Sequence, residues 1–144
     1  MTYTNDAASQ TIAAYEAGAS AQQRAVGDLS RSLDDVRRRI VKANEARTAC
    51  RQARDKQLEA ADDLKRLART VSASARIPRA DAIADQVSRP ACDDLDEAVA
   101  ACDTAIAELE QRAMLLSGKL SSAKSSLAGM QAKIDGLREQ VARG

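Results

Sequence analysis

Residues 95–141, LDEAVAACDTAIAELEQRAMLLSGKLSSAKSSLAGMQAKIDGLREQV, place a small or apolar residue at alternating steps of four and three. An average repeat of 3.5 residues is typical of the seam of a left-handed coiled coil. The pattern therefore predicts a long helix that packs along a second helix. The predicted seam residues are Leu95, Val99, Cys102, Ile106, Leu109, Ala113, Leu116, Leu120, Ala123, Leu127, Met130, Ile134, Leu137 and Val141.

The first half of the chain repeats the same pattern with one irregularity. Two steps of three meet at Ala43, which predicts a stammer that overwinds the supercoil locally. Alanine, leucine, isoleucine and valine supply most of the positions, and the chain has no Phe or Trp. A narrow seam between helices suits this composition better than a globular core. The predicted seam residues are Ile12, Tyr15, Ala19, Gln22, Val26, Leu29, Leu33, Val36, Ile40, Ala43, Ala46, Cys50, Ala53, Gln57, Ala60, Leu64, Leu67 and Val71.

Pro78 and Pro90 separate the two patterns, and a residue that precedes proline is biased away from helical geometry. We expect an all-α fold: a long antiparallel helical hairpin or coiled coil with a short helix at its tip, within a larger helical bundle or assembly. If Ala75 lies opposite Cys92, facing residue numbers add to about 167, and residues before about 25 have no partner in the hairpin. The expected segments are an N-terminal helical segment (1–27), a long helix (28–75), a proline-bounded connector (76–93) and a second long helix (94–144).

Two surfaces rich in small residues are candidates for association between chains. The N-terminal segment has few charges, and a Gly/Ser/Ala stripe follows the second helix opposite its leucine seam. Small residues let two helix backbones approach closely. The alternative is a water-exposed face that tolerates small residues. The candidate oligomer-interface residues are Ile12, Tyr15, Ala19, Gly118, Ser122, Ser125, Gly129, Ala132 and Gly136.

Charge is unevenly distributed along the chain, although the net charge is only +1. Residues 24–56 and 111–144 are mainly basic, and residues 81–110 are mainly acidic. In the expected register the two basic stretches lie side by side, so the acidic tip of another copy would relieve their repulsion by staggered contacts. A nucleic acid or another anionic surface would do the same. The anionic-partner candidates are Arg37, Arg38, Arg39, Lys42, Arg47, Arg51 and Arg54.

Residues that could carry chemistry are few. The chain has no histidine, no glycine-rich phosphate loop and no zinc-type cysteine pair. We therefore expect no enzyme activity and no catalytic, cofactor-binding or metal-binding residue. Cys50 and Cys102 occupy seam positions, and aspartates beside Cys92 oppose formation of its thiolate.

The leading functional hypothesis is a non-enzymatic structural or assembly protein, a coiled-coil subunit that self-associates through its N-terminal segment and the Gly/Ser/Ala stripe, with charge-polarised staggered contacts. The expected partner is a second copy of the chain or another helical protein. One alternative is a basic-ended adaptor for nucleic acid or another anionic surface. Another is a helical-hairpin component or chaperone of a secretion or virion assembly. No apolar run approaches the roughly 18 residues of a membrane span, and residues 1–10 do not resemble a signal peptide. We expect a cytoplasmic or virion-internal protein, and secretion without a cleaved signal stays an alternative.

Overall fold

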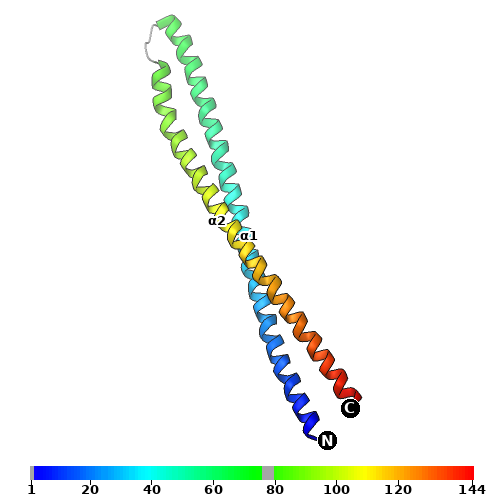
Figure 1. The fold of residues 1–144 in the computed structure, drawn as a ribbon. Helices are drawn as coiled ribbons and strands as arrows, with labels where there is room; N and C mark the ends of the chain where they lie inside the picture. The colour runs from blue at the N-terminus through cyan, green and yellow to red at the C-terminus, as the bar shows by residue number, and fades with distance from the viewer. Residues whose placement is uncertain (1, 76–79) are drawn as a thin grey trace. The chain divides into compact units, whose positions relative to one another are not determined.

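The fold consists of two long helices that pack against each other as an antiparallel hairpin (Figure 1). The computed structural model describes residues 2–75 and 80–144, without the side chains of residues 2–5, 68, 71–75, 80, 81 and 84. Helix α1 spans Thr2–Ala75 and helix α2 spans Ala80–Arg143, with no strand in the described ranges. The expected all-α helical hairpin is confirmed. Two compact units divide the chain: unit 1 is Met1–Arg37 with Gln111–Gly144, and unit 2 is Arg38–Glu110.

The seam predicted on α2 is confirmed along its whole length. Every predicted seam residue from Leu95 to Val141 is buried or half-buried, and Ala98 is the one other residue of 95–144 that is not exposed. Ile106 and Ile134 are the most deeply buried of these residues. The 3.5-residue repeat therefore identifies the face by which α2 packs on α1.

Helix α2 continues through Pro90, so the expected connector at 76–93 is wrong for residues 80–93. The region expected to form a separate short helix near residues 79–88 is part of α2 from Ala80 onward, and residues 76–79 lie outside the described residues. Asp85, Ser88 and Cys92 are all protected and extend the seam upstream in the same steps of three and four. Pro90 lies on the exposed face of α2, so its ring does not disturb the packed seam. Proline has no N–H to donate to the carbonyl of Gln86, and this carbonyl is also on the exposed face.

The register of the hairpin differs from the expected one because α2 begins earlier than expected. In unit 2, ion pairs join Arg47 to Asp103, Arg54 to Asp96, and Lys65 to Asp85. The residue numbers add to 150 in each pair, not to about 167. A change of 17 in this sum moves one helix by roughly 25 Å along the other, at 1.5 Å per residue. Opposite neighbours are therefore different throughout the hairpin.

The predicted stammer on α1 is also wrong. The seam continues from Ala43 by a step of four to Arg47, followed by Cys50, Arg54, Ala61 and Lys65, of which Ala61 is buried and the others are half-buried. The alanines and leucines predicted for this part of the seam are mainly exposed. Long Arg and Lys side chains can line a seam by their methylene groups while their charged ends reach its edge, which the apolar pattern did not anticipate. The exposed members of the predicted set are Ala46, Gln57, Ala60, Leu64 and Leu67.

In unit 1 the N-terminal part of α1 packs on the C-terminal part of α2. The Arg138 guanidinium pairs with Glu16, and Lys133 Nζ lies 5.6 Å from the centroid of the Tyr15 ring. A Cβ built on Gly18 would lie 3.5 Å from Met130 Sδ, an ordinary van der Waals distance. The expectation that residues before about 25 lack a partner within the hairpin is therefore wrong.

The register can be tested with the native cysteines. Residue 100 lies level with Cys50, and Cys102 is two residues further along α2, about 3 Å of helical rise. In a Cys92→Ala chain, we expect a short bis-maleimide reagent to join Cys50 to Cys102 within one molecule at high dilution. Peptide mass spectrometry would identify the product.

A matched control moves the second thiol to the position that the alternative register would favour. With Cys102 replaced by Ala and Ser117→Cys introduced, we expect no crosslink to Cys50. A crosslink in the control and none in the Cys50/Cys102 chain would contradict the register of unit 2.

Candidate functional site

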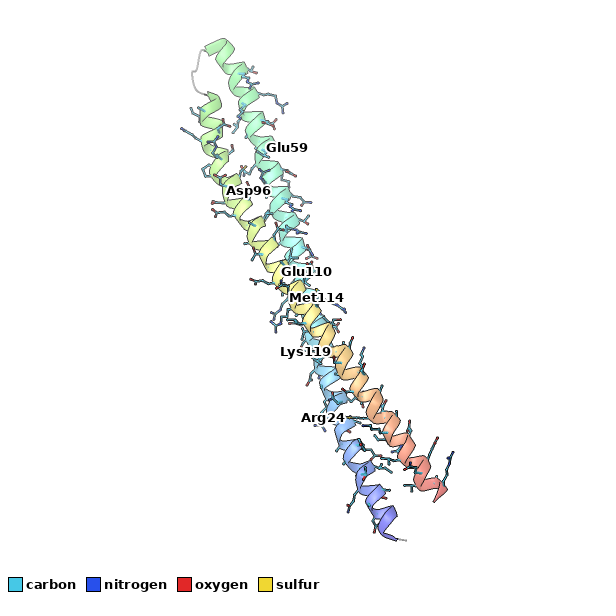
Figure 2. All side chains as sticks on the ribbon, in the orientation of Figure 1. Arg24, Glu59, Asp96, Glu110, Met114 and Lys119 are labelled. Atoms are coloured by element: carbon cyan, nitrogen blue, oxygen red, sulfur yellow. The ribbon has the colours of Figure 1, made fainter. Side chains whose placement is uncertain are left out.

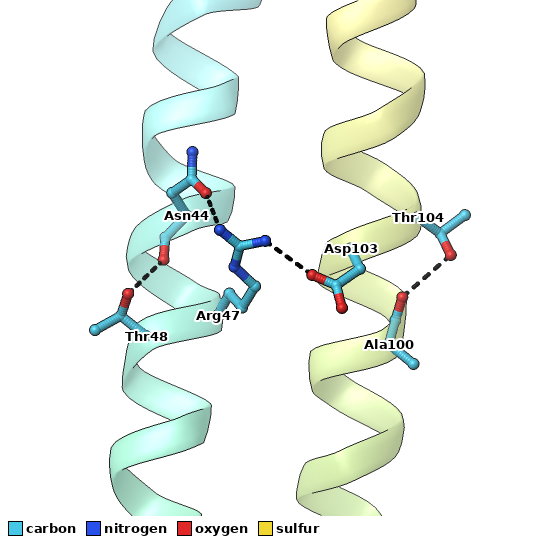
Figure 3. Close-up of polar contacts among 6 residues, drawn as sticks. All are labelled: Asn44, Arg47, Thr48, Ala100, Asp103 and Thr104. Atoms are coloured by element: carbon cyan, nitrogen blue, oxygen red, sulfur yellow. Dashed lines mark hydrogen bonds and ion pairs between the residues drawn. The ribbon is translucent and has the colours of Figure 1, made fainter.

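Two of the predicted anionic-partner residues, Arg47 and Arg54, are held in the seam of unit 2. Arg47 donates a 2.9 Å hydrogen bond from Nη1 to Asp103 Oδ1 and a 2.7 Å hydrogen bond from Nη2 to Asn44 Oδ1 (Figure 3). Arg54 Nε lies 2.5 Å from Asp96 Oδ1, but this buried N–H makes no hydrogen bond, so the pair is electrostatic and poorly aligned. Both side chains are committed to carboxylates of the same chain.

The remaining basic candidates, Arg37, Arg38, Arg39, Lys42 and Arg51, are exposed. They do not form a strongly positive unit, because the register places the basic part of α1 opposite the acidic part of α2. The sequence of unit 2 contains 13 Lys and Arg and 14 Asp and Glu. In unit 2 the basic residues 38–56 therefore lie opposite acidic residues, so the expected juxtaposition of two basic stretches, with its repulsion, is wrong for this part of the chain.

The Lys65–Asp85 pair lies near the end of unit 2 where α1 ends and α2 begins. Lys65 Nζ is 2.6 Å from Asp85 Oδ1. The hydrogen bond and charge of Lys65, with a smaller contribution from Arg89, lower the pKa of Asp85 below its ordinary value of 3.8, against a weaker opposing effect of desolvation. The carboxylate form of Asp85 therefore favours the folded hairpin.

The candidate oligomer-interface residues fall into two groups. Ile12, Tyr15 and Ala19 are half-buried and lie on the intramolecular seam of unit 1. All six residues of the Gly/Ser/Ala stripe are exposed, and a Cβ added at its glycines would meet no atom within 4 Å. The stripe residues are Gly118, Ser122, Ser125, Gly129, Ala132 and Gly136.

Large apolar side chains accompany the stripe at the start of the α2 segment in unit 1. Figure 2 labels Met114 on α2. Met114 is 76% exposed and Leu115 is 68% exposed. Leu115 precedes Gly118 by three residues, so it continues the stripe in the same sequence of steps. Within this unit the stripe and Leu115 form one outward face that α1 does not cover.

A second exposed apolar group, in unit 2, was not among the sequence candidates. Leu64, Leu67, Ile83 and Val87 are 47%, 61%, 56% and 66% exposed. Leu64 and Leu67 were placed in the predicted seam. The sequence signal for this group was the seven-residue spacing of Arg47 and Arg54, which continues the seam from Ala43. A seam predicted through these arginines places Leu64 and Leu67 on the outside of α1.

The three thiols occupy protected positions. Cys92 is buried at 8% exposure, Cys50 and Cys102 are half-buried, and all three are free. In the described ranges, no group of three or more His, Cys, Asp or Glu side chains is arranged to hold a metal ion. No helix among the described residues has an apolar stretch long enough to span a membrane.

Replacement of Arg54 by Leu is expected to stabilise the hairpin. The change puts apolar surface in the seam and removes a buried N–H without a hydrogen bond, while the half-exposed Asp96 stays in contact with water. We expect the free energy of unfolding to rise by about 1 kcal/mol, measured by urea denaturation with far-UV CD. Ala53→Leu is the control, because the predicted seam with the stammer contains Ala53 in place of Arg54. A larger rise in the free energy of unfolding from Ala53→Leu than from Arg54→Leu would contradict the observed seam.

Acid is expected to weaken the hairpin through Asp85. Because the folded-state pKa lies below the unfolded value, the stabilising effect is present above the unfolded pKa and is lost as pH falls through the folded pKa. Asp85→Asn should therefore reduce stability at neutral pH and flatten the loss of stability below about pH 4, where the unfolded carboxyl titrates. The prediction is tested by measuring the urea midpoint of unfolding at several pH values for the original chain and for Asp85→Asn. The same dependence of the midpoint on pH in both chains would exclude the effect.

Comparison of this chain with protein families, curated proteins and solved structures finds no match. Function is therefore inferred from the packing, the charges and the exposed faces of the two units.

Proposed function

We propose that this chain is a non-enzymatic structural protein, a coiled-coil subunit that self-associates. The observation that carries the proposal is that large apolar side chains remain outside a completed seam. Met114 and Leu115 in unit 1 and Leu64, Leu67 and Val87 in unit 2 are exposed although each helix already packs on its partner. Clustered exposed apolar side chains commonly mark protein interfaces.

In unit 1, self-association is assigned to the Gly/Ser/Ala stripe with Leu115 at its head. Glycine in an exposed helix interior costs about 1 kcal/mol relative to alanine, and Gly118, Gly129 and Gly136 make no close contact in the chain that would offset this cost. A second helix lying against the stripe would use the missing side chains for close approach. Ile12, Tyr15 and Ala19 contribute less, because their seam positions are already occupied by unit 1 itself.

The adaptor alternative has less support. Arg47 and Arg54 pair with aspartates, and the charges of unit 2 nearly cancel. A nucleic-acid ligand would show affinity that falls steeply with salt. No particular observation favours a secretion or virion chaperone.

The test is light scattering coupled to size-exclusion chromatography, at low and high salt, on the original chain and on Gly129→Leu. We expect the original chain to be larger than a monomer and to retain its size in salt, because apolar packing holds it together. Gly129→Leu should shift the equilibrium toward smaller species, because a leucine side chain blocks close approach.

Ser121→Leu is the matched control, since Ser121 is exposed on the same helix but lies off the stripe. Equal behaviour of the two leucine variants would remove the stripe from the proposal. A monomer at every concentration and salt would overturn self-association itself, and a salt-sensitive complex with nucleic acid would favour the adaptor.

A further inference from the structure

The two sides of the seam in unit 2 differ in chemistry. One side carries the ion pairs of Arg47 with Asp103 and of Arg54 with Asp96. The other side is formed by flanking residues that recur every seven positions beside the seam, because an antiparallel pair places these positions of both helices on the same flank. Among the described side chains of unit 2 they are Arg39, Ala46, Ala53, Ala60 and Leu67 on α1, and Ala91, Ala98 and Ala105 on α2.

We call this flank the apolar side of unit 2. Ala53, Ala91 and Ala98 are half-buried, and the other members are exposed. Because alanine side chains are short, another helix could approach both α1 and α2 at the lower end of the usual range of interaxial distances, about 8 Å. Apart from Arg39 at one end, these flanking residues are uncharged, whereas the opposite flank carries the two ion pairs.

Large apolar side chains extend the apolar side near the end where α1 stops and α2 starts. Leu64 and Leu67 of α1 and Val87 of α2 are 47%, 61% and 66% exposed. The numbers of Leu64 and Val87 add to 151, so these two residues lie nearly level in the observed register. The apolar side is therefore a continuous face with its bulkiest residues at one end.

The two edges of this face carry opposite charges at matching levels. Lys42 and Lys56 lie along the α1 edge, and Glu108 and Asp94 lie along the α2 edge, with Ala49 and Ala101 between them. Asp63 follows Lys56 on the α1 edge and pairs with Arg66 of the same helix. The numbers of Lys42 and Glu108 add to 150, and so do those of Lys56 and Asp94. In the described residues, neither lysine pairs with either acid within the chain.

We propose that the apolar side of unit 2 binds the same face of a second copy of this chain, related by a two-fold axis parallel to the helices. The proposal rests on the self-association put forward above and adds an interface in unit 2 to the stripe of unit 1. In this arrangement α1 of each copy lies over α2 of the other. Lys42 then meets Glu108 of the partner subunit, and Lys56 meets Asp94 of the partner subunit, at the same level along the helices.

Charge selects this arrangement over the other two-fold packing of the same faces. With the axis perpendicular to the helices, α1 would lie over α1 and the lysine edges would meet each other. Like charges at an interface oppose binding, whereas the parallel axis pairs each of the two lysines with an acid of the partner subunit. Asp63 lies level with Val87 and is outside these pairs. The parallel axis also brings Leu64 and Leu67 of one copy over Val87 of the partner subunit, which buries the large apolar residues of both copies.

The test uses charge reversal at the two edges. Lys42→Glu with Lys56→Glu makes all four paired positions acidic, and Asp94→Lys with Glu108→Lys makes all four paired positions basic. We expect each double variant to raise the dimer dissociation constant about tenfold or more by sedimentation velocity, because every edge pair becomes repulsive. The chain with all four changes should return close to the original constant, since opposite charges meet again.

Arg38→Glu with Arg51→Glu is the control, because it makes the same charge change in unit 2 away from the apolar side. If an oligomer forms but ignores both edge variants, this interface is overturned while self-association stands. If the original chain is a monomer at all concentrations, both proposals fail together. If the four-fold variant stays as weak as the double variants, the assignment of the pairs is wrong.

Disulfide trapping tests the geometry directly. In chains whose three native cysteines are replaced by Ala, and whose folding is checked by far-UV CD, Ala49→Cys and Ala101→Cys are introduced separately. Oxidation of the mixture should give a disulfide dimer of the two different chains, and oxidation of either chain alone should not. A dimer from Ala49→Cys alone would support the perpendicular axis and overturn the proposed one.

Discussion

The register between α1 and α2 is the constraint on which the rest of the structure depends. Arg47, Arg54 and Lys65 line the seam, and each has an aspartate of α2 at the level of its charged end. A different register would separate these three partly exposed side chains from their aspartates. These charged residues therefore contribute more to the choice of register than to the stability of the hairpin. In unit 1, residues before 25 pack on the C-terminal part of α2.

Pro90 has a smaller effect than its chemistry alone would indicate. Loss of one backbone hydrogen bond and the clash of the ring bend or end many helices, but at this position both effects fall on the exposed face. Ser88 and Cys92 on either side are buried against α1. Tertiary packing on the seam thus offsets a local penalty, and α2 continues to Ala80. That continuity moves the start of the second helix and changes every opposite pair.

The same register separates charge from apolar surface. Basic residues of α1 face acidic residues of α2, so the uneven charge along the chain is neutralised within unit 2. What remains outside the seam is the Gly/Ser/Ala stripe in unit 1 and a face of alanine, leucine and valine in unit 2. Recognition on such surfaces depends on close packing and on charges at the edges, a pattern that fits another helical hairpin better than an extended polyanion.

The sequence by itself determined the helical class, the hairpin and the seam of α2 from Leu95 to Val141, because a repeat of 3.5 residues has one structural meaning over such a length. It also located the N-terminal seam from Ile12 to Ala43. Only the tertiary structure decided the seam beyond Ala43, the path through Pro90 and the register. A hydrophobic pattern favours Leu64 over Lys65 and Ala53 over Arg54 as seam residues. In the structure Lys65 and Arg54 occupy the seam, because Asp85 and Asp96 lie opposite them. Which residues lie opposite depends on where α2 begins, and that depends on contacts far apart in the chain.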